Sequence, residues 1–388
     1  MSGRRWHPSE ESDELVFVVC DRFLHQLGLQ YGTGKPGKDK TDSSEADKRG
    51  AAAAVAEWLH QKYGRPDLSR ERVYPLFWEA ARRGFLLLQP PREEDLARRI
   101  AERYAVSRFA QDRETIQVVN VRGTEASSHV ASAGADLLVS LIKRLGRKRK
   151  ETSAADPSIH IGLGGGYSAM VVAKRLAERI YSDLDCPPLV LHALSGGGFL
   201  IDEPRKSPIT YFTFFDDVLV DLKFVALFSA TVVPSEQYEQ VISNPGVRES
   251  FELAQQIDIV VTSFAQAGHR HGLLNQHLKH LMDTGALKPQ DLDRMKAAGW
   301  IGDVQFRPYG PHGPILDECP VKAVTLFELD DLAALARRED KYVVLFAGPC
   351  GECGQTKTSA LVPLLTEPRL RLWTHLVTDV QTASELLH

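Results

Sequence analysis

The sequence predicts an α/β protein with an N-terminal winged helix-turn-helix followed by a larger, mostly parallel, doubly wound domain. Two patterns indicate this architecture. Residues 1–91 alternate helical segments with turns marked by Gly and Pro, whereas the later chain alternates short apolar strands with helical segments. Strands that are apolar throughout are typical of a parallel sheet covered on both faces. The length of 388 residues, with 43% hydrophobic and 25% charged residues, fits two or three globular domains rather than a disordered or fibrous chain.

The sequence also indicates in which cellular compartment the protein is expected. No run of about 18 apolar residues is present, so we expect no membrane-spanning helix and no membrane partner. The basic start, Met1–Arg5, leads into an acidic stretch rather than an apolar one, which is unlike a secretory signal. Five cysteines are too few for a disulfide framework in a chain of 388 residues. We therefore expect a cytoplasmic protein.

The N-terminal segment has the element order of a winged helix-turn-helix. We predict helices, a flexible insertion and a strand, in the order helix 11–29, insertion 31–50, helix 51–63, turn 64–68, helix 72–83 and strand 85–88. Ser69 is placed to cap the third helix and Gly84 to end it. Pro75 falls inside this third helix, where the missing N–H and the ring clash cost ~3 kcal/mol unless the helix begins later or kinks.

Charge is unevenly distributed along the chain. The net charge is -4, yet residues 48–83 contain eight Lys or Arg against four acidic residues, so this segment carries +4 and the remainder -8. A basic segment attached to an acidic body is typical of a nucleic-acid-binding head on a larger domain. A solvated helical face is the alternative that charge alone leaves open.

We divide the remainder into a linker helix and strand, 92–120, and an effector domain, 121–388. The linker helix carries one apolar stripe (Leu96, Ile100 and Tyr104), which suits pairing with a second copy or packing on the next domain. Strands are expected at 118–121, 159–163, 189–194, 224–228, 257–262, 323–329, 342–347 and 372–378.

The most informative motif is a glycine-rich turn, residues 162–169, between a predicted strand and a predicted helix. Its candidate ligand-binding residues are Gly164, Gly165, Gly166, Tyr167 and Ser168. Glycines let the backbone approach an anion closely, and the first free N–H groups of the helix point toward it. The motif lacks the Gly-Lys-Ser/Thr of a Walker loop and does not fit the dinucleotide spacing. A tight turn needed only for packing is the alternative interpretation.

Two further residues could contribute to an anion site. Lys357 follows the strand predicted at 342–347, so a parallel sheet would place it at the same edge as the glycine-rich turn. A lysine there could neutralise a phosphate through a charge-assisted hydrogen bond. Asp303 follows Gly302 and could hold a ligand hydroxyl or cap a turn.

Cysteine and histidine patterns give little reason to expect a metal. Cys350 and Cys353 form a single CxxC without a second pair or an evident histidine ligand, whereas structural zinc needs four ligands. We expect two unpaired thiols, with a thiol–disulfide switch as the alternative. The histidines at 269, 271, 277 and 280 match no metalloprotease motif, and no Gly-x-Ser-x-Gly elbow is present. No metal and no cofactor are therefore predicted.

Taken together, these segments resemble the SorC family of bacterial transcriptional regulators, whose effector domain is related to the DeoR sugar-phosphate-sensing domain and to phosphosugar isomerases. The resemblance covers roughly residues 50–388 in consistent order. It rests on the basic helix and wing 69–86, the linker 90–96, the loop 161–168, the triple glycine 196–198, Gly299–Asp303, Gly354–Lys357 and Thr378–Ala383. The chain departs from the family pattern at Ser168, where threonine is usual, and at Cys353, which replaces a glycine.

The resemblance implies a DNA-binding regulator, not an enzyme, that binds a sugar-phosphate effector. The effector's phosphate would be bound by Gly164, Gly165, Gly166, Tyr167, Ser168 and Lys357, with Asp303 near its hydroxyls. Operator DNA would be contacted by Arg65, Ser69, Arg70, Arg72, Arg82 and Arg83, with Arg70 and Arg72 nearest the bases. A homo-oligomer, dimer or tetramer, would present paired heads to repeated half-sites.

Two other functions remain open from the sequence. A phosphosugar isomerase or deaminase could use Asp303 as a base, but it would need a second positioned acid or base and no basic head. A ligand sensor could instead use its head to bind a protein, since Tyr74, Phe77 and Trp78 lie on the third helix.

Overall fold

A computed structural model describes the chain except for residues 1–5, 32–49, 87–88, 182, 198–202 and 317–318. The chain divides into two compact units, residues 1–88 and 89–388. The insertion predicted at 31–50 lies outside the described residues, apart from its two end positions. None of the described helices is long and apolar enough to cross a membrane.

The first unit is built from three helices, which confirms the helices predicted there. They are α1 (Asp13–Tyr31), α2 (Ala51–Tyr63) and α3 (Arg70–Arg82), preceded by the short 3-10 turn η1 (Pro8–Glu10). Each pair of helices is in contact, and all three contribute to one apolar core. Val16 and Val19 of α1, Val55 and Leu59 of α2, and Leu76 of α3 are fully buried in it.

Helix α3 is ended by Gly84 as predicted. Gly84 has φ +76°, and the Phe85 N–H donates back to the Ala80 carbonyl (2.8 Å). This left-handed C-terminal turn satisfies carbonyls that the helix would otherwise leave unpaired. Ser69 occupies the N-cap, although its hydroxyl donates to Glu71 rather than accepting a helix N–H. The helix runs through Pro75 without interruption.

The structure describes residues 85–86 of the strand predicted at 85–88, and these two residues do not form a strand. Phe85 and Leu86 form a bend, and the last two residues of the predicted strand, 87–88, are outside the described part. Among the described residues of the first unit there is no strand for Phe85 and Leu86 to pair with. The helix-turn-helix is therefore present, whereas the wing is not shown.

The second unit contains a parallel sheet, as predicted. Its parallel strands, in spatial order, are β1 (Ile116–Val119), β12 (His375–Asp379), β11 (Tyr342–Ala347), β6 (Ile259–Gln266), β2 (Ile159–Leu163), β3 (Leu189–Ala193) and β4 (Leu222–Val225). An antiparallel extension on β6 consists of β7 (Gly302–Val304), β8 (Arg307–Gly310) and β9 (Gly313–Pro314). A separate antiparallel pair is formed by β5 (Val232–Pro234) and β10 (Val321–Ala323).

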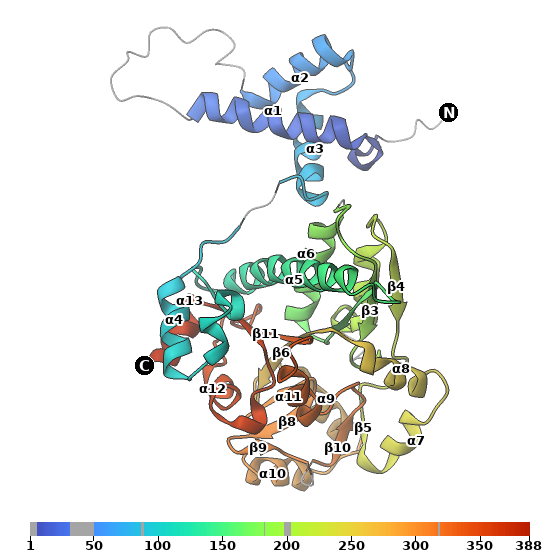
Figure 1. The fold of residues 1–388 in the computed structure, drawn as a ribbon, viewed down its shortest axis with the longest axis vertical. Coiled ribbons are helices and arrows are strands. Elements are labelled where there is room, and N and C mark those ends of the chain that lie inside the picture. Colours follow the sequence, from blue (N-terminus) through green and yellow to red (C-terminus); the bar gives the residue numbers. More distant parts are fainter. Residues whose placement is uncertain (1–5, 32–49, 87–88, 182, 198–202, 317–318) are drawn as a thin grey trace. The chain divides into compact units, whose positions relative to one another are not determined.

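Helices cover both faces of the sheet (Figure 1). One face packs against α5 (Ala126–Glu151) and α6 (Tyr167–Ile180), and the other against α4 (Glu94–Arg103), α11 (Leu329–Ala336), α12 (Thr358–Thr366) and α13 (Val380–Leu387). Alternate residues of β11 confirm the two cores, since Val344 and Phe346 join the first while Val343 and Leu345 join the second. The sheet is therefore doubly wound.

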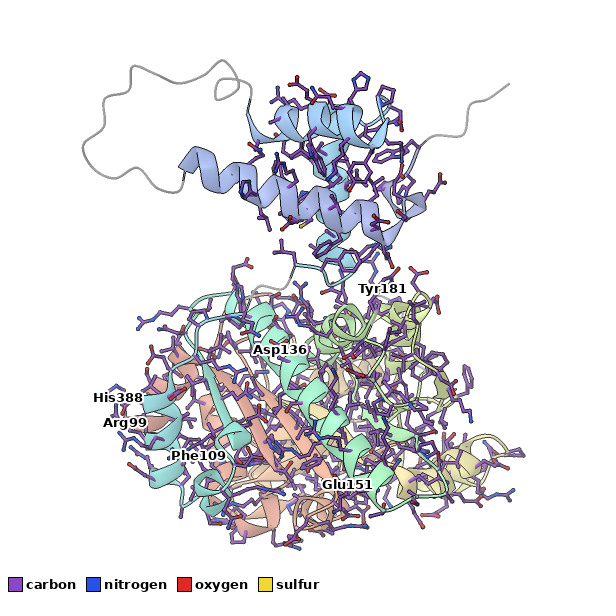
Figure 2. All side chains as sticks on the ribbon, turned by 45° about the horizontal axis from the view of Figure 1, so that its top comes forward. Arg99, Phe109, Asp136, Glu151, Tyr181 and His388 are labelled. Carbon is purple, nitrogen blue, oxygen red and sulfur yellow. The ribbon has the colours of Figure 1, made fainter. Side chains whose placement is uncertain are left out.

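Helix α4, which the sequence assigns to a linker, packs on α13 within the second unit. The Tyr104 hydroxyl donates to the Leu386 carbonyl (2.9 Å), and Arg103 donates to the Leu387 carbonyl (2.7 Å). Figure 2 shows Arg99 of α4 beside the C-terminal His388. Of the two arrangements that its apolar stripe allowed, the helix adopts the one packed on the adjoining domain.

The remaining helices described in the second unit are α7 (Tyr238–Ile242), α8 (Val247–Leu253), α9 (Leu273–Asp283) and α10 (Pro289–Ala297). Helices α7 and α8 bury Tyr238 and Val247 in the same core as α4 and α11. Helices α9 and α10 share a small core with β5 and β10, in which Leu274, Leu278 and Met295 are buried. Phe306, from the turn between β7 and β8, belongs to the same core.

Two predictions for the second unit need correction, and one helix was not predicted. The segment 224–228 is not a buried strand, because β4 is an edge strand in which Phe224 is 44% exposed, and Phe228 beyond it is 76% exposed. The segment 323–329 is not one strand, because β10 ends at Ala323, Thr325 forms only an isolated bridge with Ser195, and α11 begins at Leu329. Helix α5 has no predicted counterpart, although it crosses one face of the sheet between the labelled Asp136 and Glu151 (Figure 2).

We expect Gly134→Ala to destabilise the second unit. Helix α5 approaches β11 so closely at this position that an added Cβ would lie 1.9 Å from Phe346 Cε1. Overpacking of this kind costs about 1–3 kcal/mol, more than alanine gains in helix propensity. Gly146→Ala on the same helix is the matched control, because its Cβ would come no closer than 3.0 Å to Pro187. Urea unfolding of both variants tests this, and equal stability of the two would contradict it.

Candidate functional site

Three neighbouring parallel strands, β2, β6 and β11, end at one edge of the sheet. The loops that follow them line a cavity together with the β7–β8 hairpin. The volume of this cavity is about 100 Å³, which is room for several water molecules or one small anionic group. The carboxyl edge of an open α/β sheet is where such folds bind ligands.

The glycine-rich loop between β2 and α6 forms one wall of the cavity, through residues 165–168. Gly164 lies behind this wall. Its N–H donates to the Val261 carbonyl (2.9 Å), and a Cβ at this position would lie 3.0 Å from the same oxygen. Gly164 therefore permits the close approach of the loop to β6, and the structure does not place it on the cavity surface.

Only some amides of the loop are free for a ligand. Gly166 has φ +111°, and its N–H donates to the Lys206 carbonyl (2.9 Å), so this amide is already engaged. The N–H groups of Gly165, Tyr167 and Ser168 have no hydrogen-bond partner among the described residues. Tyr167 and Ser168 are the first two residues of helix α6, where the helix dipole favours an anion.

The structure brings Lys357 to the same cavity, as predicted from the shared carboxyl edge of a parallel sheet. Its Nζ donates to the Phe264 carbonyl (3.0 Å) and lies 5.0 Å from the centre of the Phe264 ring. Burial lowers the pKa of Lys357, although nearby Cys350 and Asp303 act in the opposite direction. Within the described residues no carboxylate forms an ion pair with Lys357, so two of its N–H groups are available to an anion.

Asp303 also lines the cavity, from the middle of β7. It is 6% exposed. Burial raises the pKa of Asp303 to about 7, against the opposing effect of Lys357. A carboxyl group with such a pKa is partly protonated at neutral pH, and it can donate a hydrogen bond to a ligand oxygen or accept one from a hydroxyl.

The raised pKa of Asp303 predicts a pH-dependent stability. The folded state binds this proton more tightly than the unfolded chain does, so the stabilisation is present below about pH 4 and is lost as the pH rises through 7. We expect the free energy of unfolding of the wild type, relative to Asp303→Asn, to fall by about 3 kcal/mol between pH 5 and pH 8. Urea unfolding at both pH values measures this, with the exposed Asp293→Asn as control. A difference that does not change with pH would contradict the prediction.

A second lysine at the cavity was not predicted. Lys206 is buried, and its Nζ pairs with Glu203 (2.8 Å) and with Glu352 (3.0 Å). Burial lowers the pKa of Lys206, but the two carboxylates outweigh this effect and the net shift is upward. Glu352 also pairs with His271 (2.5 Å), which joins the loops after β6 and β11. Lys206 therefore has carboxylate partners, whereas Lys357 has none in the part of the chain that the structure describes, and no sequence motif indicates the position of Lys206.

Gln305 is the second site residue that sequence reasoning missed. The hairpin between β7 and β8 turns through Gln305 (φ +51°) and Phe306 (φ +62°), as in a two-residue type I′ turn. Asn-Gly usually occupies such turns, so this pair is strained. The Gln305 amide lines the cavity, is 6% exposed, and neither its nitrogen nor its oxygen has a partner among the described residues. A buried amide without partners is costly unless a ligand or water satisfies it.

The CxxC turn and one histidine also meet here, although the sequence shows no evident histidine ligand for the two thiols. Cys350, Cys353 and His269 offer ligand atoms that all lie within 4.8 Å of one another. Cys353 Sγ is 3.4 Å from His269 Nε2, and all five cysteines are free thiols. The reason is topological: His269 follows β6 and the cysteines follow β11, and these strands are neighbours.

In the first unit, the structure overturns the prediction that Arg83 holds DNA phosphate. Its side chain is 4% exposed. It donates to Glu79 (2.7 Å) and Asp13 (2.6 Å), and to the carbonyls of Ser9 and Glu11. Arg83 is therefore an internal cross-link between α3 and the start of α1, and its donors are not available to DNA.

The other predicted DNA-contacting residues differ in how far they are engaged. Arg65 pairs with Glu11 (2.7 Å) and Asp67 (2.9 Å), and Arg82 pairs with Glu79 (2.8 Å). Arg72 lies over the Trp6 ring (4.7 Å). Arg70 is exposed, and its side chain makes no hydrogen bond or ion pair seen among the described residues. Arg70, beside the exposed Ser69, is thus the arginine most free to approach a partner.

Known structures share this architecture, although their sequences are distant. No family model and no curated protein matches the sequence. The full-length sorbitol operon regulator SorC from Klebsiella pneumoniae superposes with a TM-score of 0.53 at 16% identity, over 97% of this chain and 100% of that one. The chain has the SorC fold.

Two further structures share the fold over about three quarters of this chain. A DeoR family transcriptional regulator from Listeria monocytogenes gives a TM-score of 0.51 at 15% identity, over 75% of this chain and 98% of that one. A transcriptional regulator from Streptococcus pneumoniae TIGR4 gives 0.52 at 16% identity, over 76% of this chain and 95% of that one. The resemblance predicted from the sequence is confirmed at the level of the fold.

One motif of the resemblance has a structural role in this SorC fold. In the closing segment 378–383, Asp379 caps α13 and accepts hydrogen bonds from the N–H groups of Gln381 (2.9 Å) and Thr382 (3.0 Å). The Thr382 hydroxyl donates to the other oxygen of Asp379 (2.6 Å). The motif therefore fixes the start of the last helix rather than lining the cavity.

Proposed function

We propose that this protein is a DNA-binding transcriptional regulator controlled by a phosphorylated sugar or a related carbohydrate metabolite. The observation that carries the proposal is the convergence of Lys357 and the free amides of the glycine-rich loop in one cavity at the carboxyl edge of the sheet. The fold supports it, because the full-length structure that it matches is a sorbitol operon regulator.

The donors in the cavity favour a phosphate group. Among the described residues, three backbone N–H groups have no partner and Lys357 has no carboxylate ion pair, so both offer donors, and the lysine offers positive charge, to an anion. Asp303 and the unpartnered Gln305 amide offer both acceptors and donors, as sugar hydroxyl groups require. The donors and acceptors that line the cavity therefore suit the chemistry of a phosphorylated polyol better than that of a neutral sugar or an inorganic anion alone.

In the proposed DNA complex, α3 is the recognition helix and Arg70, with Ser69 and Arg72 near it, contacts the DNA. Second units from two or four copies assemble so that paired heads contact repeated half-sites. The effector shifts the balance between two arrangements of this oligomer, which requires that it bind one arrangement more tightly than the other.

A thermal-shift panel tests the effector. We expect sugar and polyol phosphates to raise the melting temperature of the wild type, whereas the same compounds without phosphate do not. NMR spectroscopy of the compound after incubation separates a sensor from an isomerase or deaminase, because a sensor returns it unchanged. Failure of every phosphorylated compound, or turnover of one of them, would contradict the proposal.

A selection from random DNA tests the partner. We expect the wild type to enrich fragments that carry repeated half-sites, with affinity that falls steeply as salt rises, and Arg70→Ala to lose most of this affinity. The matched control is Arg248→Ala, an exposed arginine of the second unit. Binding that is insensitive to salt and to Arg70→Ala would overturn the DNA half of the proposal.

One observation favours a second candidate for the head. Trp78 is 67% exposed and Tyr74 is 43% exposed on α3, which is unusual for large aromatic side chains. A sensor whose head binds a protein would use this surface. Trp78→Ala then removes partner binding while Arg70→Ala leaves it intact, the reverse of the result expected for DNA.

A further inference from the structure

The group of Cys350, Cys353 and His269 is left unexplained by phosphate binding. We propose that these three residues bind a Zn²⁺ ion through two thiolates and one imidazole nitrogen. The proposal concerns the metal alone and does not depend on the function proposed above.

The distances in the group fit a tetrahedral metal. Zinc bonds of about 2.3 Å to sulfur and 2.0 Å to nitrogen place neighbouring S and N ligands about 3.5 Å apart. Cys353 Sγ and His269 Nε2 are 3.4 Å apart, and all three ligand atoms lie within 4.8 Å of one another. An ion therefore needs only small side-chain adjustments to reach all three.

The backbone holds the two sulfurs on one compact turn. The Gly354 N–H donates to the Cys350 carbonyl (2.8 Å), and the Cys350 N–H donates to the Gln355 carbonyl (2.9 Å). Gly354 has φ +71°, which closes the turn. At Gly351 the turn packs so closely on the Tyr167 ring that a Cβ would lie 2.4 Å from Tyr167 Cε1. The site is thus built on two neighbouring strand ends rather than on one mobile loop.

The ligand types select the metal. Two cysteine sulfurs and one imidazole are soft or borderline donors, which favour Zn²⁺ over Mg²⁺ or Ca²⁺. Within the described residues no fourth His, Cys, Asp or Glu joins the group. Three protein ligands and one open position are typical of zinc sites that also bind water or a small molecule. His269 and Cys350 line the cavity, so an exogenous fourth ligand can approach from there.

Metal binding has a consequence for the histidine. Zinc at Nε2 of a neutral imidazole places the ring proton on Nδ1. The His271 N–H now approaches that Nδ1 at 3.3 Å, so this weak contact has to open when the ion binds. The nitrogen then offers its proton to a carbonyl or to water, as metal-bound histidines usually do.

The test uses the full-length reduced protein, stripped with a chelator and then titrated with Zn²⁺ in competition with a chromophoric chelator. We expect one ion per chain, and with Co²⁺ a thiolate charge-transfer band that reports sulfur ligation directly. Cys350→Ser, Cys353→Ser and His269→Gln are each expected to weaken binding by at least about 100-fold, since even a lost outer-shell partner costs 10–100-fold. Cys319→Ser is the matched control, a free cysteine outside the group.

The outcomes are separable. Zinc affinity equal in the wild type and in Cys350→Ser, or lost in Cys319→Ser as well, overturns the proposal. A disulfide between Cys350 and Cys353 in protein kept under anaerobic reducing conditions, with no zinc uptake, overturns it in favour of a redox pair. If a variant fails to fold, the Co²⁺ spectrum of the wild type still tests the proposal, because absence of the thiolate charge-transfer band contradicts sulfur ligation.

Discussion

Lys357→Met is expected to remove most of the thermal stabilisation that phosphorylated sugars give the wild type. The ammonium has no carboxylate partner among the described residues, so its charge is available to a bound phosphate. A hydrogen bond to a charged group contributes about 1.5–3 kcal/mol, which corresponds to a 10- to 100-fold loss of affinity. Methionine keeps the length and the packing on Phe264. Isothermal titration with the best compound of the thermal-shift panel measures the loss.

The same substitution has a second expected effect, on Asp303. Lys357 lowers the pKa of Asp303 from the higher value that burial alone would give, so its removal raises this pKa further. The downward slope of stability with pH then extends above neutrality. Lys174→Met is the matched control, because Lys174 is exposed on α6 of the same unit. Equal ligand affinity in Lys357→Met and Lys174→Met would contradict the proposal that the effector is bound through a phosphate group at Lys357.

Much of the cavity could be predicted because it depends on sheet topology. Glycines between an apolar strand and a helix mark a turn whose amides face outward, and Lys357 follows another apolar strand. In a parallel sheet the carboxyl ends of strands share an edge, so both segments had to lie at the same rim. The structure adds that β2 and β11 flank β6, an order that one sequence does not reveal.

The missed residues depend on geometry without a local sequence signal. Gln305 occupies a type I′ turn that usually requires Asn-Gly, so no turn motif indicates the hairpin. His269 meets the CxxC only because β6 and β11 are neighbours. Helix α5, in contrast, has apolar residues at helical spacing, such as Leu138, Leu141, Ile142 and Leu145, which could have been recognised. Its N-terminal residue Glu125 makes no capping hydrogen bond, so a start signal was absent.

The basic residues of the first unit show why a count of charges overestimates the surface available to DNA. Eight basic residues in 48–83 predict a DNA-binding surface, yet Arg83 is buried and Arg65 and Arg82 have carboxylate partners. A carboxylate four residues before an arginine, as in Glu79 and Arg83, is a common pattern of pairing on one helix. The charge that remains available to DNA is therefore smaller than the count suggests.

Arg83→Ala is expected to unfold the head, with a loss of about 3–5 kcal/mol, the cost of breaking a buried ion pair. The substitution leaves the Glu79 carboxylate buried at 4% exposure with only Arg82 as partner. It also removes the donors to Asp13 and to the carbonyls that hold the start of α1. Hydrogen exchange followed by mass spectrometry measures the effect, as a loss of protection in α1, α2 and α3.

Arg70→Ala separates folding from binding in the same helix. Arg70 is exposed and makes no side-chain contact seen among the described residues, so its removal is expected to change stability by less than about 0.5 kcal/mol. A DNA-binding head then loses affinity in both variants, but loses hydrogen-exchange protection only in Arg83→Ala. If Arg83→Ala keeps full protection, the buried cross-link is not what holds α3 to α1. In that case the assignment of Arg83 to the interior rather than to DNA has to be reversed.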